Sequence, residues 1–200
     1  MPDGVYVDCT FGRGGHAGAL LARLGEQGRL YAFDRDGEAA AARPDLLADR
    51  RLHFTRQPFS AARSTLERAA VYGAIDGILM DLGVSSPQLD TGERGFSFQH
   101  DGPLDMRMDT STGDTAAAWL ARAAVEDIER CLREYGEERH ARRIARRIVE
   151  ARAQAPLDTT RKLADLVSAV VPRGGERLHP ATRTFQALRI QINDELGELT

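Results

Sequence analysis

The residue types that could do chemistry near the start of the chain are grouped in Gly12-Arg-Gly-Gly-His16, shortly after the apolar residues 5–7. Glycine lets the backbone turn tightly and come close to a ligand where a Cβ atom would collide. The first turn of a following helix presents unpaired N–H groups, which bind phosphates and other polar ligands. The segment therefore predicts a nucleotide-type site, although an ordinary strand-to-helix turn can contain the same glycines.

A carboxylate follows at the spacing that such a site needs. Asp34 comes directly after a second apolar run, residues 29–33, about 20 residues beyond the glycines. In β-α-β nucleotide sites a carboxylate at this place accepts hydrogen bonds from the ribose hydroxyls. The alternative is a solvated residue at the end of a strand.

Two later strand ends add further candidates. Phe59 follows residues 52–55, which predict a third short strand. Its ring could lie against an adenine or belong to the core, and Ser60 could cap the next helix. Asp81 ends the following apolar run and opens a segment, 82–109, that has no hydrophobic periodicity. We expect this segment to be a functional loop, because a connection of that length is rarely only a connector.

The elements that must position these residues alternate between strand and helix four times over the first 81 residues. Such alternation predicts an α/β fold with a doubly wound parallel sheet, in which ligands bind outside the carboxyl ends of the strands. From about residue 115 the pattern becomes entirely helical. One of these helices, 138–153, has arginines on its polar side that could face RNA phosphate or only solvent: Arg142, Arg143, Arg146 and Arg147.

Composition excludes several classes of protein. A formal net charge of −3 and a pI near 6.0 are not those of a polycation, so any binding of nucleic acid must use a local patch. Cys9 and Cys131 are far apart in the sequence, which argues against a disulfide scaffold or a zinc site. No signal peptide is visible and no apolar run approaches ~20 residues, so we expect a cytoplasmic protein.

The sequence resembles the MraW or RsmH family of S-adenosylmethionine-dependent methyltransferases, which methylate N4 of a cytidine in small-subunit (16S) ribosomal RNA. The resemblance covers nearly the whole chain and is carried by residues 8–16, 34–36, 81–88, 95–98, 102–108, 135–139 and 179–186. It implies S-adenosylmethionine as cofactor, held by Gly14, Gly15, His16, Asp34, Phe59, Asp81 and Gln88. The implied partner is ribosomal RNA or the assembled small subunit, and a homodimer is an open alternative.

The resemblance also implies a domain organisation. A Rossmann-like methyltransferase core would cover residues 1–112, an inserted all-helical domain for RNA recognition would cover 113–178, and the helix 179–200 would return to the core and still be running at Thr200. Family segments before and after these 200 residues are missing, so we expect part of a longer protein. The fourth strand would then have a bare edge.

Methyl transfer is an in-line displacement, so the enzyme must mainly position donor and acceptor and exclude water. We assign the catalytic region to Asp81, Ser85, Ser86 and Pro87, whose carbonyls and hydroxyls could accept hydrogen bonds from the amino group of cytosine. Gln88 stands where related amino-methyltransferases have an aromatic residue, so Phe96 or Phe98 is the candidate for stacking the base, with a core role open for either ring.

Three alternatives stay open. A nicotinamide-dependent dehydrogenase could use the same glycine turn and Asp34. A non-catalytic RNA-binding fragment could act through the arginine-rich helix alone. The methyl acceptor could also be DNA or protein instead of RNA.

Overall fold

The computed structural model describes residues 1–171 and 179–199, which form two compact units. The first, here called the sheet unit, contains residues 1–85, 108–110 and 198–199. The second, the helical unit, contains residues 86–107, 111–171 and 179–197. Each unit has its own core and is described separately.

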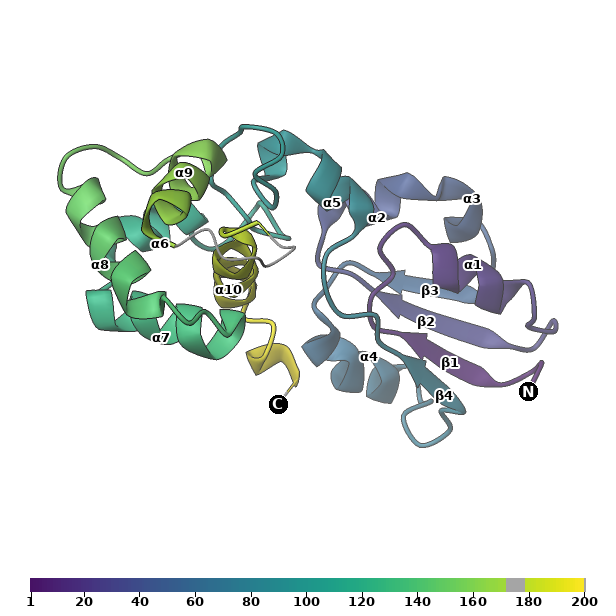
Figure 1. Ribbon diagram of the computed structural model, residues 1–200. Helices are drawn as coiled ribbons and strands as arrows, with labels where there is room; N and C mark the ends of the chain where they lie inside the picture. The colour runs from purple at the N-terminus through teal and green to yellow at the C-terminus, as the bar shows by residue number, and fades with distance from the viewer. Residues whose placement is uncertain (172–178, 200) are drawn as a thin grey trace. The chain divides into compact units, whose positions relative to one another are not determined.

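The sheet unit is built on four parallel strands: β1 (Val5–Asp8), β2 (Arg29–Phe33), β3 (Leu52–Thr55) and β4 (Gly77–Leu79). Their order is β3-β2-β1-β4, so the chain steps outward from β1 on one side and then returns to the other side of β1 (Figure 1). In register, Val7 lies between Tyr31 of β2 and Ile78 of β4. The order changes direction between β1 and β4, which is where sheets of this kind bind ligands. The predicted α/β class with a parallel sheet is confirmed.

Helices cover both faces of this sheet (Figure 1). Strands that are buried on both faces need apolar side chains on both faces. Leu30 and Ala32 of β2 pack in one cluster with residues of α1 (Gly15–Leu21). Tyr31 and Phe33 point the other way, into a cluster with Leu66 of α4 (Ala62–Arg68). The remaining helices of this unit are α2 (Gly37–Ala42), α3 (Pro44–Leu47) and the 3-10 turn η1 (Phe59–Ala61).

The outer side of β4 is a bare sheet edge among the described residues, as the sequence predicted. β4 pairs with β1 alone and has only three residues. Apolar side chains on and after it are exposed: Ile78 by 61%, Met80 by 48% and Leu82 by 51%. An uncovered edge with apolar side chains is a site for pairing with another chain.

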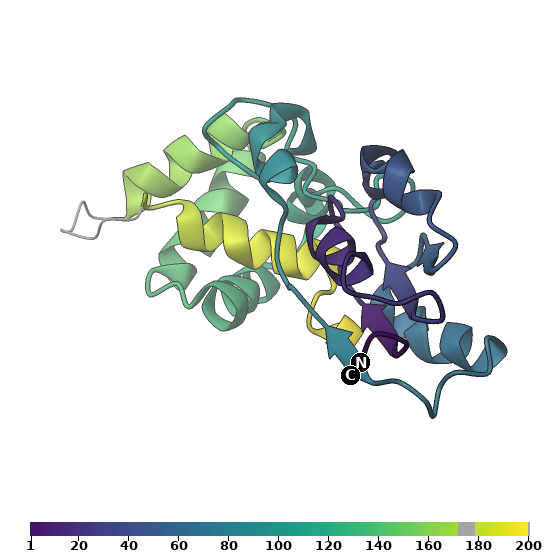
Figure 2. The same cartoon turned by 90° about the vertical axis from the view of Figure 1, so that its right-hand side faces the viewer.

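The helical unit contains α5 (Ser86–Asp90), η2 (Gly92–Arg94), α6 (Ala116–Arg122), α7 (Val125–Gly136), α8 (Ala141–Arg152), α9 (Thr160–Val170) and α10 (Thr182–Asn193), and η3 (Gly197–Leu199) follows it. Thr115 and Thr159 cap α6 and α9, because their side chains accept hydrogen bonds from the backbone N–H groups of Ala118 and Lys162. α10 packs against α7 (Figure 2). The two helices meet closely at Gly136, where an added Cβ would be 2.5 Å from the Arg183 carbonyl oxygen.

The segment 82–109 is a long connection in which only α5 and η2 are helical, and its functional role stays a prediction. Its backbone is held by two hydrogen bonds to later parts of the chain, from Leu104 N–H to Asp158 O and from Thr160 N–H to Gly102 O. Two expectations about elements are wrong. The last helix does not run to Thr200, because α10 ends at Asn193 and the next residue, Asp194, has a φ of 47° that breaks the helix. Ser60 does not cap α4, since η1 precedes that helix and no side-chain cap is present.

The predicted domain boundaries at 112 and 178 stay a prediction. The compact units divide the chain differently: the helical unit already begins at Ser86 and includes α10.

Candidate functional site

The glycine turn after β1 has the backbone geometry that its residues predict. Gly12 and Gly14 have φ angles of +54° and +70°, which side chains rarely tolerate, and Gly14 N–H donates to Phe11 O at 2.7 Å. An added Cβ at Gly14 would be 2.8 Å from Leu46 Cδ1, whereas one at Gly15 would meet nothing within 4 Å. The turn is therefore tight on its inner side and open at Gly15, where a ligand could approach.

Asp34 lies directly against this turn. Its Oδ2 accepts a hydrogen bond from Gly12 N–H at 2.7 Å and its Oδ1 accepts one from Asp36 N–H at 2.8 Å. Burial raises the pKa of the Asp34 carboxyl, and the two backbone hydrogen bonds offset part of that rise. The structure thus brings together the two features that the sequence singled out, 22 residues apart.

Asp8, at the end of β1, is a further candidate site residue that the sequence reasoning missed. Its side chain is fully buried, and Oδ1 accepts a hydrogen bond from Thr10 N–H at 3.0 Å. Oδ2 has no hydrogen-bond partner among the residues that the structure describes. Burial raises the pKa of this carboxyl, and the charge of nearby Asp34 adds to the rise. The sequence does indicate Asp8 as a candidate, because it is an acidic residue at the end of a strand, directly before the glycine turn.

His16 and Asp81 complete the edge where β1 and β4 end. Asp81 N–H donates to Thr10 Oγ1 at 2.8 Å, and His16 Nδ1 is 3.8 Å from Asp81 Oδ2. Both side chains are largely exposed, 57% and 69%, so this contact contributes little to stability. Their polar groups remain accessible to a ligand at this edge.

Phe59 lies in η1, just after β3, and is half-buried against the core cluster of α4. Its predicted contact with an adenine stays a prediction. Ser85 ends the main segment of the sheet unit, whereas Ser86, Pro87 and Gln88 open α5 in the helical unit, where Gln88 is buried. The roles assigned to these four residues also stay predictions.

The two candidate stacking rings are packed inside the helical unit. Phe96 is buried, with the Arg94 guanidinium 5.8 Å from its centroid. Phe98 is half-buried, with centroids 4.4 Å from His179 and 5.0 Å from Phe185. This packing is a core role, and stacking on a base stays a prediction for both rings.

The arginines of α8 lie on one exposed face. Ala141, Ile144, Ala145 and Ile148 form its buried side. The opposite side carries the exposed residues Arg142, Arg143, Arg146 and Arg147. Arg147 also lies 3.4 Å from Glu150. The helix is amphipathic as predicted, while its contact with RNA stays a prediction.

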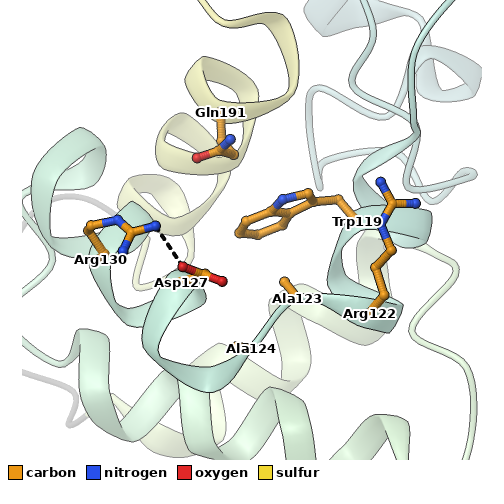
Figure 3. Close-up of a pocket in the computed structure, with 7 residues that line it drawn as sticks. All are labelled: Trp119, Arg122, Ala123, Ala124, Asp127, Arg130 and Gln191. Carbon is orange, nitrogen blue, oxygen red and sulfur yellow. Dashed lines mark hydrogen bonds and ion pairs between the residues drawn. The ribbon is translucent and has the colours of Figure 1, made fainter.

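A pocket of about 580 Å³ opens between α6, α7 and α10 of the helical unit. The indole ring of Trp119 points into it, with Arg122 and Arg130 on either side and Gln191 across from it (Figure 3). Arg130 donates to Asp127 at 2.6 Å, and Arg122 is paired with Asp114. An aromatic face beside guanidinium groups can stack a planar base and hold phosphate. Sequence reasoning missed this pocket, although Trp119 is the only tryptophan in the chain.

The described residues offer neither a metal site nor a membrane span. No group of three or more His, Cys, Asp or Glu side chains among them could hold a metal ion. No helix in that part of the chain has the length and apolar character needed to cross a membrane.

Comparison with known proteins places these features in a family. The model of the MraW methylase family matches residues 1–200. The chain is 58% identical to the ribosomal RNA small subunit methyltransferase H of Thioalkalivibrio sulfidiphilus over 199 residues, which are 99% of this chain and 63% of that protein. Proteins of the same name from Methylococcus capsulatus and Alteromonas mediterranea are 56% and 52% identical, over 99% of this chain and 66% and 63% of their own lengths. The chain thus spans just under two thirds of these curated relatives.

Proposed function

The chain belongs to the MraW methylase family, and from this we propose that its sheet unit binds S-adenosylmethionine and that the protein methylates N4 of a cytidine in small-subunit ribosomal RNA. One observation above all supports the cofactor site: the glycine turn, Asp34 and Asp81 converge at the carboxyl ends of the strands. That is the edge at which a doubly wound sheet binds nucleotides.

The residues present fit this cofactor. The space at Gly15 is open, so the backbone there can lie against a ligand. Asp34 would accept hydrogen bonds from the ribose hydroxyls while it keeps its contact with Gly12. Asp8 has a buried carboxylate oxygen without a hydrogen-bond partner in the described part of the chain, which suits a donor on a cationic ligand. Phe59 would contact the adenine ring, and His16 and Asp81 the rest of the molecule.

When bound, S-adenosylmethionine supplies an electrophilic methyl group on a sulfonium. The protein's part is to orient the acceptor and to exclude water. The amino group of cytosine is a weak nucleophile, so acceptors for its N–H bonds would favour reaction at nitrogen. We assign this task to the carbonyls and hydroxyls of residues 85–87, just after Asp81, with Phe96 or Phe98 as the stacking ring if the segment rearranges on binding RNA.

Two surfaces of the helical unit support an RNA substrate. The exposed arginines of α8 would contact phosphates, and the Trp119 pocket would hold a base of the substrate RNA. Small-subunit ribosomal RNA as substrate is drawn from the names of the relatives. A cytoplasmic location follows from this substrate.

Two measurements on the 200-residue chain test the proposal. Isothermal titration should detect binding of S-adenosylmethionine and none of NAD, which separates the proposal from the dehydrogenase alternative. Transfer of a tritiated methyl group to small subunits, followed by nucleoside analysis, should yield N4-methylcytidine. Cofactor and RNA binding without transfer would leave a binding role only, and a different methylated nucleoside would refute the cytosine-N4 assignment.

A further inference from the structure

The carboxylate of Glu198 connects two loops of the sheet unit. Glu198 lies in η3, and its Oε1 is 2.6 Å from Nη2 of Arg35. Its Oε2 accepts a hydrogen bond from the backbone N–H of Ser60 at 3.3 Å. The side chains of Arg35 and Glu198 are only 19% and 16% exposed, so this ion pair is screened less than one at the surface.

The two loops are the ones that carry proposed cofactor residues. Arg35 directly follows Asp34, the residue proposed for the ribose. Ser60 directly follows Phe59, the residue proposed for the adenine ring. The loops come after different strands, β2 and β3, so nothing in the local sequence fixes the distance between them. A single carboxylate that bonds to both does fix it, by one charge-assisted contact and one backbone hydrogen bond.

We propose that Glu198 is a positioning residue for the adenosine part of the cofactor. It acts through Arg35 and Ser60, so that Asp34 and Phe59 stay at a fixed separation before the ligand arrives. The hydrogen bond from Asp34 N–H to Thr55 O ties the two loops together only where they leave the strands. Without the carboxylate of Glu198 their separation farther out would be set less strictly, and the cost of setting it on binding would reduce affinity. The inference rests on the proposed S-adenosylmethionine site.

Substitution of Glu198 provides the test. Glu198→Ala removes both contacts and should weaken binding of S-adenosylmethionine by about tenfold. Glu198→Gln keeps the length of the side chain and one oxygen acceptor, but it loses the charge. Its amide nitrogen must face either the Arg35 guanidinium or the Ser60 N–H, which are both donors. The Gln variant should therefore show an intermediate affinity.

Glu195→Ala is the matched control. Glu195 lies three residues earlier and pairs with Arg189 at 2.7 and 3.1 Å, with side chains 17% and 20% exposed. That ion pair resembles the one of Glu198 in distance and burial, but both of its residues belong to the helical unit. The control variant should lose a similar amount of stability and keep the cofactor affinity of the parent.

Calorimetry with three ligands distinguishes the outcomes. S-adenosylmethionine, S-adenosylhomocysteine and adenosine should lose affinity for Glu198→Ala by the same factor, because only the adenosine part is affected. If the parent chain binds S-adenosylmethionine and folded Glu198→Ala binds it equally well, Glu198 is only a structural residue and the inference is wrong. An equal loss in Glu195→Ala also overturns it, because the effect is then one of general stability. If the parent chain binds none of the three ligands, the proposed function itself fails.

Discussion

Asp8 and Asp34 distinguish the proposed binding edge from ordinary surface. Burial raises the pKa of both carboxyls, and each holds a backbone N–H of the glycine turn, that of Thr10 or that of Gly12. Carboxylates that are partly stripped of water and incompletely paired cost stability in the free protein. A ligand with hydroxyl or ammonium donors would compensate that cost, so both residues are suited to binding.

Asp34→Ala should weaken S-adenosylmethionine binding by about 1–3 kcal/mol, since it removes charge-assisted hydrogen bonds to the ribose. Asp34→Asn keeps one oxygen acceptor and should lose less. Calorimetry measures both, and Asp165→Ala, at an exposed position in α9, is the control. An unchanged affinity in folded Asp34→Ala would mean that this carboxylate does not hold the ribose.

Asp8 should make the free protein less stable as the pH rises. Its pKa is raised above the ordinary value of an aspartate, so between the two values the native state binds more protons than the unfolded state and the free energy of unfolding falls with pH. Asp8→Asn lacks this titration. The free energy of unfolding of the parent minus that of Asp8→Asn should therefore decrease as the pH rises above about 4, in urea titrations without cofactor.

Asp45→Asn is the control for this pH series. The side-chain hydrogen bond from Arg43 lowers the pKa of Asp45, so its contribution is present at neutral pH and disappears as the pH falls through the lowered value. The free energy of unfolding of the parent minus that of Asp45→Asn should therefore rise with pH. The change should be small, since the ion pair of Arg43 and Asp45 is exposed. If the difference in the free energy of unfolding between the parent and Asp8→Asn does not change with pH, the pKa of Asp8 is not raised and the prediction is wrong.

At the scale of elements, the helical unit combines a charged helix face with an aromatic pocket. The buried side of α8 faces the core and leaves its arginines outside, while α6, α7 and α10 form the Trp119 pocket. Phosphate contacts give salt-dependent affinity without sequence preference, and base contacts add selectivity. The two features therefore predict different responses to substitution.

Replacement of Arg142, Arg143, Arg146 and Arg147 by Gln should weaken RNA binding and flatten its dependence on salt by about one unit of slope for each arginine that binds a phosphate. Affinity for the cofactor should not change. Arg63→Gln with Arg68→Gln, on the exposed side of α4, is the control. Filter binding at several salt concentrations measures the slope, and an unchanged slope means that the face of α8 is merely solvated.

Trp119→Ala should cost about 1–3 kcal/mol of RNA affinity, the contribution of one stacked base. Trp119→Phe keeps an aromatic face and should retain most of the affinity. Neither change should alter the salt slope much, because the arginines of α8 are kept. Fluorescence anisotropy with a short RNA from the substrate region measures both variants, and equal losses in Ala and Phe would argue against stacking.

At the scale of the whole molecule, the chain passes between the units four times, at 85/86, 107/108, 110/111 and 197/198. Each unit buries its own core. Ile78 of β4 and the following Met80 and Leu82 are exposed apolar residues beside a strand edge that lacks a partner strand among the described residues. The low net charge of −3 opposes association only weakly.

We expect the isolated 200-residue chain to self-associate through β4. Ile78→Lys places a charge on the exposed edge and should weaken association by about 1.5–3 kcal/mol, the value of burying one such side chain. Leu89→Lys, on an apolar residue of α5 that is 41% exposed, is the control and should change little. Sedimentation velocity over a range of protein concentrations measures the self-association of the parent and of both variants. If Ile78→Lys and Leu89→Lys associate equally strongly, the edge of β4 is not the contact.

Local sequence was enough to predict the parallel sheet, the tight turn at Gly12 and Gly14, and the family. It also singled out Asp34 by its spacing from that turn, although not the hydrogen bond between Gly12 and Asp34. These features depend on residues close in sequence or on spacings within one β-α-β unit, where periodicity and glycine placement carry the information. The segment matches that indicated the family are confirmed by its model over residues 1–200.

The tertiary structure alone decided the features that depend on distant residues. Segment 82–109 folds because Leu104 and Gly102 bond to Asp158 and Thr160, far along the chain. The pocket needs Gln191 of α10 beside Trp119 of α6, and the carboxylate of Glu198 reaches Ser60 across 138 residues. Asp8 looks like any strand-end acid until the packing around it removes water and leaves one oxygen unpaired within the described residues. Hydrophobic periodicity identifies which side of an element is buried, but not which distant side chain meets it there.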